Sequence, residues 1–124
     1  MTSRIAVILL AHGTKEPAAS EPVHAYARLL AERTGLRVEP CLREFIEPSV
    51  PTVVAKLHTD GYRTIYVLPY FLFKSGHVTR DIAEDLRAQN ARYPEIAFKV
   101  GEPLGMDALL LELLLKRLEE ALAE

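Results

Sequence analysis

The feature that most constrains the fold is an alternation, repeated four times, of a short apolar segment with a longer amphipathic one. The first apolar segment, 4–11 (RIAVILLA), is an almost continuous run, which is typical of a strand covered on both faces. Strands separated by helices favour right-handed crossovers and a parallel sheet. The sequence therefore predicts one doubly wound α/β domain over residues 1–124, with a four-stranded parallel sheet and helices on both faces.

The boundaries of these elements follow from apolar spacing and from helix start and stop signals. Strands are predicted at 4–11, 36–42, 64–69 and 96–101. Helices are predicted at 20–34, from Ser49 to Gly61, at 78–92, and from Asp107 nearly to the end of the chain. Pro40 lies inside the second strand, which argues for an edge position or an early end of that strand.

Charge and cysteine content exclude several classes of protein. The net charge of -2 does not suggest a nucleic-acid-binding protein. The single cysteine, Cys41, excludes an intrachain disulfide and fits a reducing compartment, and we expect it to be an inert buried thiol. The run 5–11 is too short to span a membrane and no cleavage-like boundary follows it. We therefore expect a soluble, cytoplasmic protein.

Two of the four histidines follow predicted strands, where ligands bind in open α/β sheets. His12 follows the first strand and His77 follows the third, with Glu44 after the second. His77 also lies near the start of a helix, whose dipole disfavours protonation of the imidazole. A metal ligand or general base must be neutral, so this position suits either role. A lone histidine at such a place is usually structural, but two at one rim favour a functional site.

Other residues at the same rim have ordinary alternatives. The cations Lys15, Arg43, Lys74 and Arg80 are individually typical of a solvated surface, and position alone leaves Glu44 open between a site residue and a loop carboxylate. The run 71–73 (FLF) is expected to be exposed in a loop. It needs a cover, which could be the hydrophobic face of a ligand or a partner subunit.

Three segments together carry a resemblance to a known family. AHGTKEP follows the first strand, CLREFIEPSVP spans the end of the second, and VLPYFLFKSGHVTRDI spans the end of the third. In this order the segments resemble the short form of the sirohydrochlorin chelatases, the cobaltochelatase and ferrochelatase family of cobalamin and sirohaem synthesis. The resemblance implies a chelatase-like α/β fold and insertion of a divalent metal into sirohydrochlorin without ATP. The sequence agrees in having no GxxxxGK[ST] phosphate loop.

The resemblance also implies roles for individual residues. His12 and His77 match the two metal-handling histidines, Glu44 matches the family's acidic residue, and Glu47 lies within the matched Glu-Pro-Ser. The metal, cobalt(II) or else iron(II) or nickel(II), is a substrate, and no permanently bound cofactor is expected. Because the tetrapyrrole carries many carboxylates, we expect local cations and the loop before the third helix to bind it. The candidate substrate contacts are Lys15, Arg43, Phe71, Lys74, Ser75, Gly76 and Arg80.

The last predicted helix carries more leucines than one sheet face requires. Leu111, Leu114, Leu115, Leu118 and Leu122 form one stripe, which Leu109, Leu110 and Leu113 widen. Either the helix is wholly buried in the core, or part of it lies in the interface of a homodimer, which the resemblance also implies.

Two other functions fit parts of the pattern. A histidine phosphatase places Arg-His-Gly after its first strand, but Ala11 precedes His12 here, so the phosphate-holding arginine is missing. A non-enzymatic carrier of metal or tetrapyrrole would have the same rim without accelerating insertion. The sequence does not separate cobalt, iron and nickel, nor cobalamin from sirohaem synthesis.

Overall fold

The computed structural model describes residues 4–124, and its centre is a four-stranded parallel sheet. The strands are β1 (Arg4–Ala11), β2 (Arg37–Leu42), β3 (Tyr62–Pro69) and β4 (Ala97–Val100), in the spatial order β2-β1-β3-β4. The predicted fold class and strand positions are confirmed. β2 is an edge strand, which is the position that Pro40 predicted.

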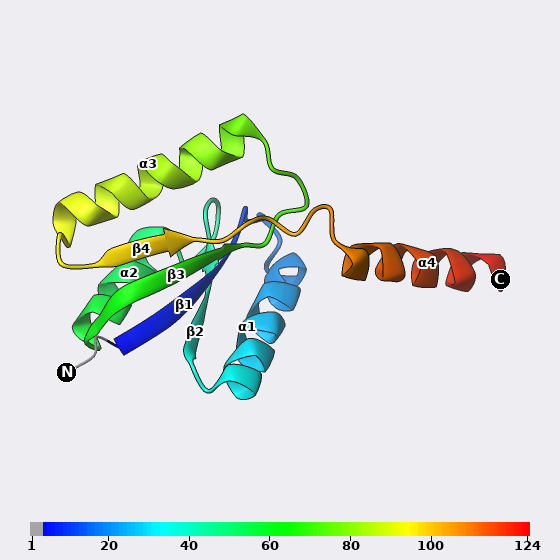
Figure 1. The fold of residues 1–124 in the computed structure, drawn as a ribbon, viewed down its shortest axis with the longest axis horizontal. Coiled ribbons are helices and arrows are strands. Elements are labelled where there is room, and N and C mark those ends of the chain that lie inside the picture. Colours follow the sequence, from blue (N-terminus) through cyan, green and yellow to red (C-terminus); the bar gives the residue numbers. More distant parts are fainter. Residues whose placement is uncertain (1–3) are drawn as a thin grey trace.

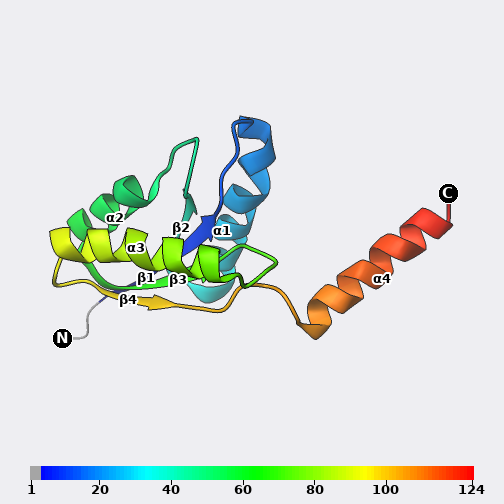
Figure 2. The same cartoon turned by 90° about the horizontal axis from the view of Figure 1, so that it is seen from above.

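Helices cover both faces of the sheet (Figures 1 and 2). One face carries α1 (Glu21–Thr34), which follows a short 3-10 turn at Pro17–Ser20. The other face carries α2 (Val50–Thr59) and α3 (Gly76–Arg92). The fourth helix, α4 (Ala108–Leu122), follows β4.

The alternation of side chains along β1 supplies two cores. Ala6, Ile8 and Leu10 lie in the cluster that contains α2 and α3, and the intervening residues, Val7 and Leu9, lie in the cluster that contains α1. A fully buried aliphatic side chain contributes about 1.5–3 kcal/mol. Both faces of β1 are therefore apolar, as its continuous hydrophobic run predicted.

Side-chain caps fix where the helices begin. The hydroxyl of Ser49 accepts a hydrogen bond from the Thr52 amide, and that of Ser75 accepts one from the Val78 amide. The carboxylate of Asp107 accepts one from the Leu109 amide at 2.9 Å. These caps satisfy amide groups that have no partner inside the helix. Ser75 thereby sets His77 in the first turn of α3.

Helix α4 projects away from the sheet (Figures 1 and 2). It contains no buried residue, and its leucines are exposed apart from the partly covered Leu110. The chain by itself therefore does not bury α4 in a core, which was one of the two interpretations of its leucine stripe. Across residues 4–124 no helix is both long and apolar enough to cross a membrane.

Candidate metal-handling site

The loops that follow β1 and β2 are joined by two backbone hydrogen bonds at the end of the paired strands. The Arg43 amide donates to the Ala11 carbonyl, and the Glu44 amide donates to the His12 carbonyl, both at 2.9 Å. This pairing places the side chains of His12 and Glu44 next to each other at the carboxyl edge of the sheet. The sequence predicted that these residues share a rim, and the backbone gives the reason.

Gly13 allows this close approach of the two loops. Its φ of 110° lies in a region that side chains disfavour, and a Cβ atom there would lie 2.0 Å from the carbonyl oxygen of Glu44. Only glycine fits between His12 and the loop after β2 without moving one of them.

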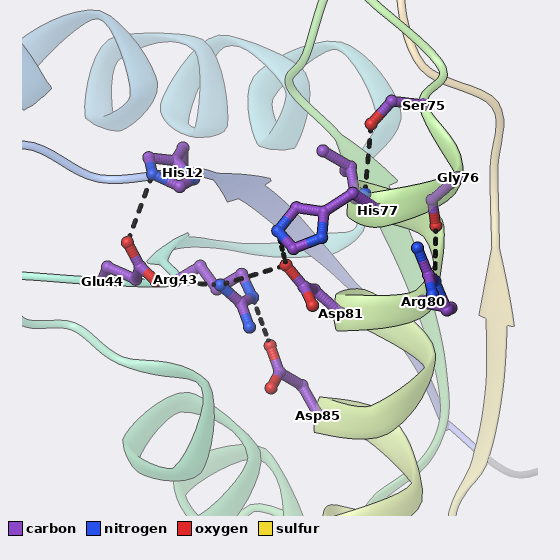
Figure 3. A network of polar contacts seen from close by, with 10 residues as sticks. His12, Arg43, Glu44, Ser75, Gly76, His77, Arg80, Asp81 and Asp85 are labelled. Carbon is purple, nitrogen blue, oxygen red and sulfur yellow. Dashed lines mark hydrogen bonds and ion pairs between the residues drawn. The ribbon is translucent and has the colours of Figure 1, made fainter.

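Each of the two rim histidines contacts a carboxylate (Figure 3). His12 Nε2 lies 3.2 Å from Glu44 Oε2, and His77 Nε2 lies 3.2 Å from Asp81 Oδ2. The imidazoles themselves are open to solvent, with 57% and 79% of their side-chain surfaces exposed. Sequence reasoning found both histidines and Glu44 but missed Asp81. The signal was available, because His77 and Asp81 are four residues apart on one helix and therefore share a face.

The arrangement is not a closed metal cage. Within residues 4–124 there is no group of three or more His, Cys, Asp or Glu side chains that could hold a metal ion. Structural metal sites usually supply four protein ligands. Two open imidazoles are instead suited to holding cobalt(II), iron(II) or nickel(II) briefly and releasing it.

Arg43 lies beneath the histidine–carboxylate pairs and contacts three carboxylates. Its Nε donates to Asp85 at 2.7 Å, and its NH1 lies 3.1 Å from Glu44 and 3.8 Å from Asp81. Partial burial by itself lowers the pKa of Arg43, but the hydrogen bond to Asp85 and the surrounding negative charges raise it above its ordinary value. The guanidinium is therefore permanently charged and already engaged.

The other predicted substrate contacts lie at the periphery of the rim. Lys15 is exposed and its ammonium group lies 5.5 Å from the ring centroid of Phe45. Lys74 forms an exposed ion pair with Glu102 at 3.1 Å. Arg80 is exposed, and its Nε donates a hydrogen bond to the carbonyl of Gly76 at 3.4 Å. Ser75 and Gly76 form the N-terminal start of α3.

Aromatic side chains lie beside His12. The ring centroids of Phe71 and Phe45 are 6.5 Å and 6.3 Å from that of His12, in edge-to-face orientations. Phe71 is half-buried, whereas Phe73 is 80% exposed, as expected for an apolar loop that needs a cover. Sequence reasoning missed Phe45, which is exposed and has a left-handed φ of 76°. Left-handed backbone at a non-glycine residue often marks a functional loop.

Two further residues have contacts other than the rim histidines. Glu47 accepts a hydrogen bond from the Ser49 amide at 3.0 Å, and this contact lowers the pKa of its carboxyl group. Burial raises the pKa of the Cys41 thiol to about 12, with smaller contributions from Glu47 and Asp85. Cys41 is fully buried, as predicted, and a buried thiol with a raised pKa is expected to be unreactive.

The fold and this rim define a class of small α/β domains that carry open histidines at the carboxyl edge of a four-stranded parallel sheet. A family model described as CbiX matches residues 6–121. The chain belongs to the CbiX family.

Individual relatives agree with this assignment. The chain is 33% identical to the sirohydrochlorin cobaltochelatase of Sulfurisphaera tokodaii, over 94% of this chain and 92% of that protein. It is 24% identical to the sirohydrochlorin ferrochelatase of Priestia megaterium over 93% of this chain, but spans only 44% of that longer protein. The cobalt complex of the Bacillus subtilis subspecies spizizenii chelatase SirB shares the fold, with a TM-score of 0.87 and 24% identity, over 94% of this chain and 50% of that one.

Proposed function

We propose that this protein inserts a divalent metal ion into sirohydrochlorin without ATP, using His12 and His77. The observation that carries the proposal is the pair of solvent-open imidazoles, each 3.2 Å from a carboxylate, at the edge where α/β folds bind ligands. The relatives named sirohydrochlorin cobaltochelatase and ferrochelatase support the reaction. They also support cobalt or iron as the substrate metal.

The reaction requires two kinds of transfer. Two pyrrole N–H protons leave the ring, and one divalent cation moves from water to the four ring nitrogens, so two protons are released for each metal inserted. A neutral imidazole can bind the metal or accept a proton, although one nitrogen cannot do both at once. We assign both tasks to His12 and His77 in turn. Glu44 holds His12 and passes its proton to solvent.

The tetrapyrrole is a polycarboxylate with a large apolar face. Lys15, Lys74 and Arg80 are exposed cations that suit its carboxylates, and the free amides at the start of α3, near Ser75 and Gly76, also suit anions. Phe71 and Phe73 suit contact with the ring face. These contacts leave the imidazoles free to act on the ring nitrogens.

The protein is proposed to act as a homodimer in which each α4 covers the partner. An apolar groove of about 420 Å³ lies between α1 and the sheet, lined by residues that include Leu30, Tyr66 and Leu68. The segment before α4 is tied down, since the Gly101 amide donates to Val67 and the Leu104 amide donates to Phe71. These bonds direct α4 away from its own groove, and its leucine stripe matches the apolar groove of a second copy.

The dimer is tested by measuring molar mass in solution. Leu115→Glu places a charge on the leucine stripe and is expected to give monomers in light scattering. Lys116→Glu introduces the same residue on the polar side of α4 and should leave the dimer intact. A wild-type chain that is monomeric at high micromolar concentration would refute this arrangement.

The reaction is tested by the absorbance change of the tetrapyrrole on metal insertion, with cobalt, iron and nickel compared on the purified protein. His12→Ala and His77→Ala are each expected to fall towards the uncatalysed rate, whereas His24→Ala, a histidine on α1, should retain activity. Insertion at the same rate with and without protein would instead favour a carrier. Turnover of a generic phosphomonoester would favour a histidine phosphatase. We place the reaction in the cytoplasm, in keeping with the single buried thiol.

We further propose that one chain supplies both histidines of each site. The ion pairs from His12 through Arg43 to His77 all lie within a single chain. Mixed dimers of His12→Ala and His77→Ala chains should therefore stay inactive. A site shared between subunits would recover about one quarter of the wild-type rate, since half of the dimers would be mixed and each would keep one of two sites.

A further inference from the structure

The two rim histidines are connected by a chain of ion pairs that passes through Arg43 (Figure 3). From His12 the contacts run to Glu44 at 3.2 Å, to Arg43 at 3.1 Å, to Asp81 at 3.8 Å, and to His77 at 3.2 Å. Asp85 holds the guanidinium from the other side at 2.7 Å. The two imidazoles have the same arrangement of partners, because each contacts one carboxylate and both carboxylates contact the same cation.

Side-chain exposure falls from the two histidines towards Arg43, at the middle of this series of ion pairs. The histidine side chains are 57% and 79% exposed, Asp81 is 25% exposed, and Arg43 is 19% exposed. Ion pairs at exposed positions contribute little because water screens them and long side chains move. The partly buried centre therefore holds the two carboxylates in place, and the imidazoles lie at the solvent-exposed ends.

We propose that Asp81 is a positioning residue for His77, as Glu44 is for His12, and that Arg43 is the common anchor of both carboxylates. This inference rests on the proposed function and deepens it. A carboxylate that contacts one nitrogen of a metal-handling imidazole fixes the orientation and tautomer of the ring. With the proton of neutral His77 held on Nε2 against Asp81, the lone pair lies on Nδ1, which is the nitrogen that can take the metal or a pyrrole proton.

The helix geometry makes this assignment specific to Asp81. His77, Asp81 and Asp85 are spaced at four-residue intervals, so they lie on one face of α3. Of the two carboxylates, Asp81 contacts the imidazole and Asp85 contacts the guanidinium. Asp85 thus fixes Arg43 against α3, and Arg43 in turn fixes Glu44, which lies in the loop after β2.

The charge balance argues that Arg43 serves the carboxylates more than the substrate. One guanidinium faces three carboxylates, so the cluster keeps two uncompensated negative charges when the imidazoles are neutral. Such a cluster attracts a divalent cation and repels a polycarboxylate. Arg43 was one of the candidate contacts for the tetrapyrrole. We assign it instead to the partly buried cluster that orients the metal-handling histidines.

Kinetics of Asp81→Asn and Asp81→Glu test the positioning role. Loss of a carboxylate behind a metal-handling histidine typically costs about 10- to 100-fold in activity or metal affinity. Asp81→Asn is expected to lose this much in kcat or in the KM for cobalt(II), with the KM for the tetrapyrrole unchanged. Asp81→Glu, which restores the carboxylate, should recover part of the loss. Glu84→Gln, which removes an exposed carboxylate from the same helix, should behave as wild type.

Arg43→Lys separates the two roles of Arg43. A lysine ammonium cannot reproduce the fork that contacts Asp85 and the two other carboxylates together. If Arg43 is an anchor, Arg43→Lys should lower kcat and leave the KM for the tetrapyrrole unchanged. A rise in the tetrapyrrole KM alone would overturn the anchor role and restore Arg43 as a substrate contact.

A spectroscopic measurement distinguishes failure of this inference from failure of the proposed function. Long-range proton–nitrogen NMR on the metal-free protein, at a pH where His77 is neutral, is expected to find the proton on Nε2. In Asp81→Ala the two tautomers should mix, while the melting temperature shows whether the variant is folded. An unchanged tautomer in a folded Asp81→Ala would overturn the positioning role even if the wild type inserts metal. If Asp81→Ala loses the tautomer preference but the wild-type protein inserts no metal, the positioning of His77 by Asp81 is supported and the proposed function is rejected.

Discussion

Replacing Gly13 with alanine tests whether the close contact of two loops builds the site. A side chain at a left-handed backbone position costs about 1–2 kcal/mol. The added Cβ would also lie 2.0 Å from the Glu44 carbonyl oxygen, so one of the loops must move. Forcing extra volume into a packed position costs about 1–3 kcal/mol. Together the two effects predict that Gly13→Ala lowers the free energy of unfolding by roughly 2–5 kcal/mol.

Two other glycines separate the contributions. Gly35 has a φ of 71° at the end of α1 but open space around it, so Gly35→Ala should show only the backbone cost, about 1 kcal/mol. At Gly105 a Cβ would lie 2.0 Å from the Leu72 carbonyl oxygen, without a left-handed φ, so Gly105→Ala should show only the clash, about 1–3 kcal/mol.

The assay is urea unfolding of all three variants, followed by metal insertion at a temperature where each is folded. Gly13→Ala should be the most destabilised and should also lose activity, because the clash displaces Glu44 from His12. Gly35→Ala should keep its activity. If Gly13→Ala proves no less stable than Gly35→Ala, the loops do not need their close contact and the explanation of the His12–Glu44 pair fails.

Three further predictions concern the rest of the chain. Leu57→Ala removes a fully buried side chain and should cost about 2–5 kcal/mol in urea unfolding, without changing the folded chain's KM values. Ser75→Ala removes the cap of α3 and should cost about 1 kcal/mol, with a measurable fall in activity because His77 lies in the first turn. Cys41 should resist a thiol reagent at pH 8 in the folded protein and react after unfolding. Since its pKa is about 12 when folded and about 8.5 when unfolded, the free energy of unfolding should fall above pH 9 by about 1.4 kcal/mol per pH unit, a slope that Cys41→Ser should remove.

The fold was predictable because local and tertiary preferences agree. The apolar run of β1 needs cover on both faces, and the structure supplies it from α1 on one side and from α2 and α3 on the other. Ser49 and Asp107 cap the helices that they were expected to cap. Pro40 marked β2 as an edge strand because proline lacks the amide that a central strand needs.

The environment of α4 could not be predicted from its leucines alone. A leucine stripe indicates that a helix packs against an apolar partner, but it does not indicate whether that partner belongs to the same chain. In the structure the amides of Gly101 and Leu104 bond to Val67 and Phe71, and α4 projects away from the sheet after this segment (Figures 1 and 2). These bonds come from the backbone of a loop, which carries no distinctive sequence pattern.

The histidines of the candidate site were predictable from the sequence, and the residues that contact them were less so. His12 and His77 were predicted because strand ends mark the rim and because two histidines at one rim favour a functional site. Asp81 was missed although its spacing from His77 on α3 was visible, because a carboxylate on an exposed helix is usually solvated. Phe45 was missed because nothing in the sequence predicts a left-handed backbone at phenylalanine.

A chelatase must attract a cation and a polyanion to one rim, and the distribution of charge offers a way to do both. The anionic cluster of Glu44, Asp81 and Asp85 surrounds Arg43 at the base, while Lys15 and Lys74 lie in the loops. At physiological ionic strength exposed charges are screened beyond about 8 Å, so each group acts mainly on the part of a ligand that contacts it. Under the proposed function the metal would meet the imidazoles over the anionic cluster, and the carboxylates of the tetrapyrrole would meet the loop cations. Because the two partners are not drawn to the same charges, binding one need not displace the other before the metal enters the ring.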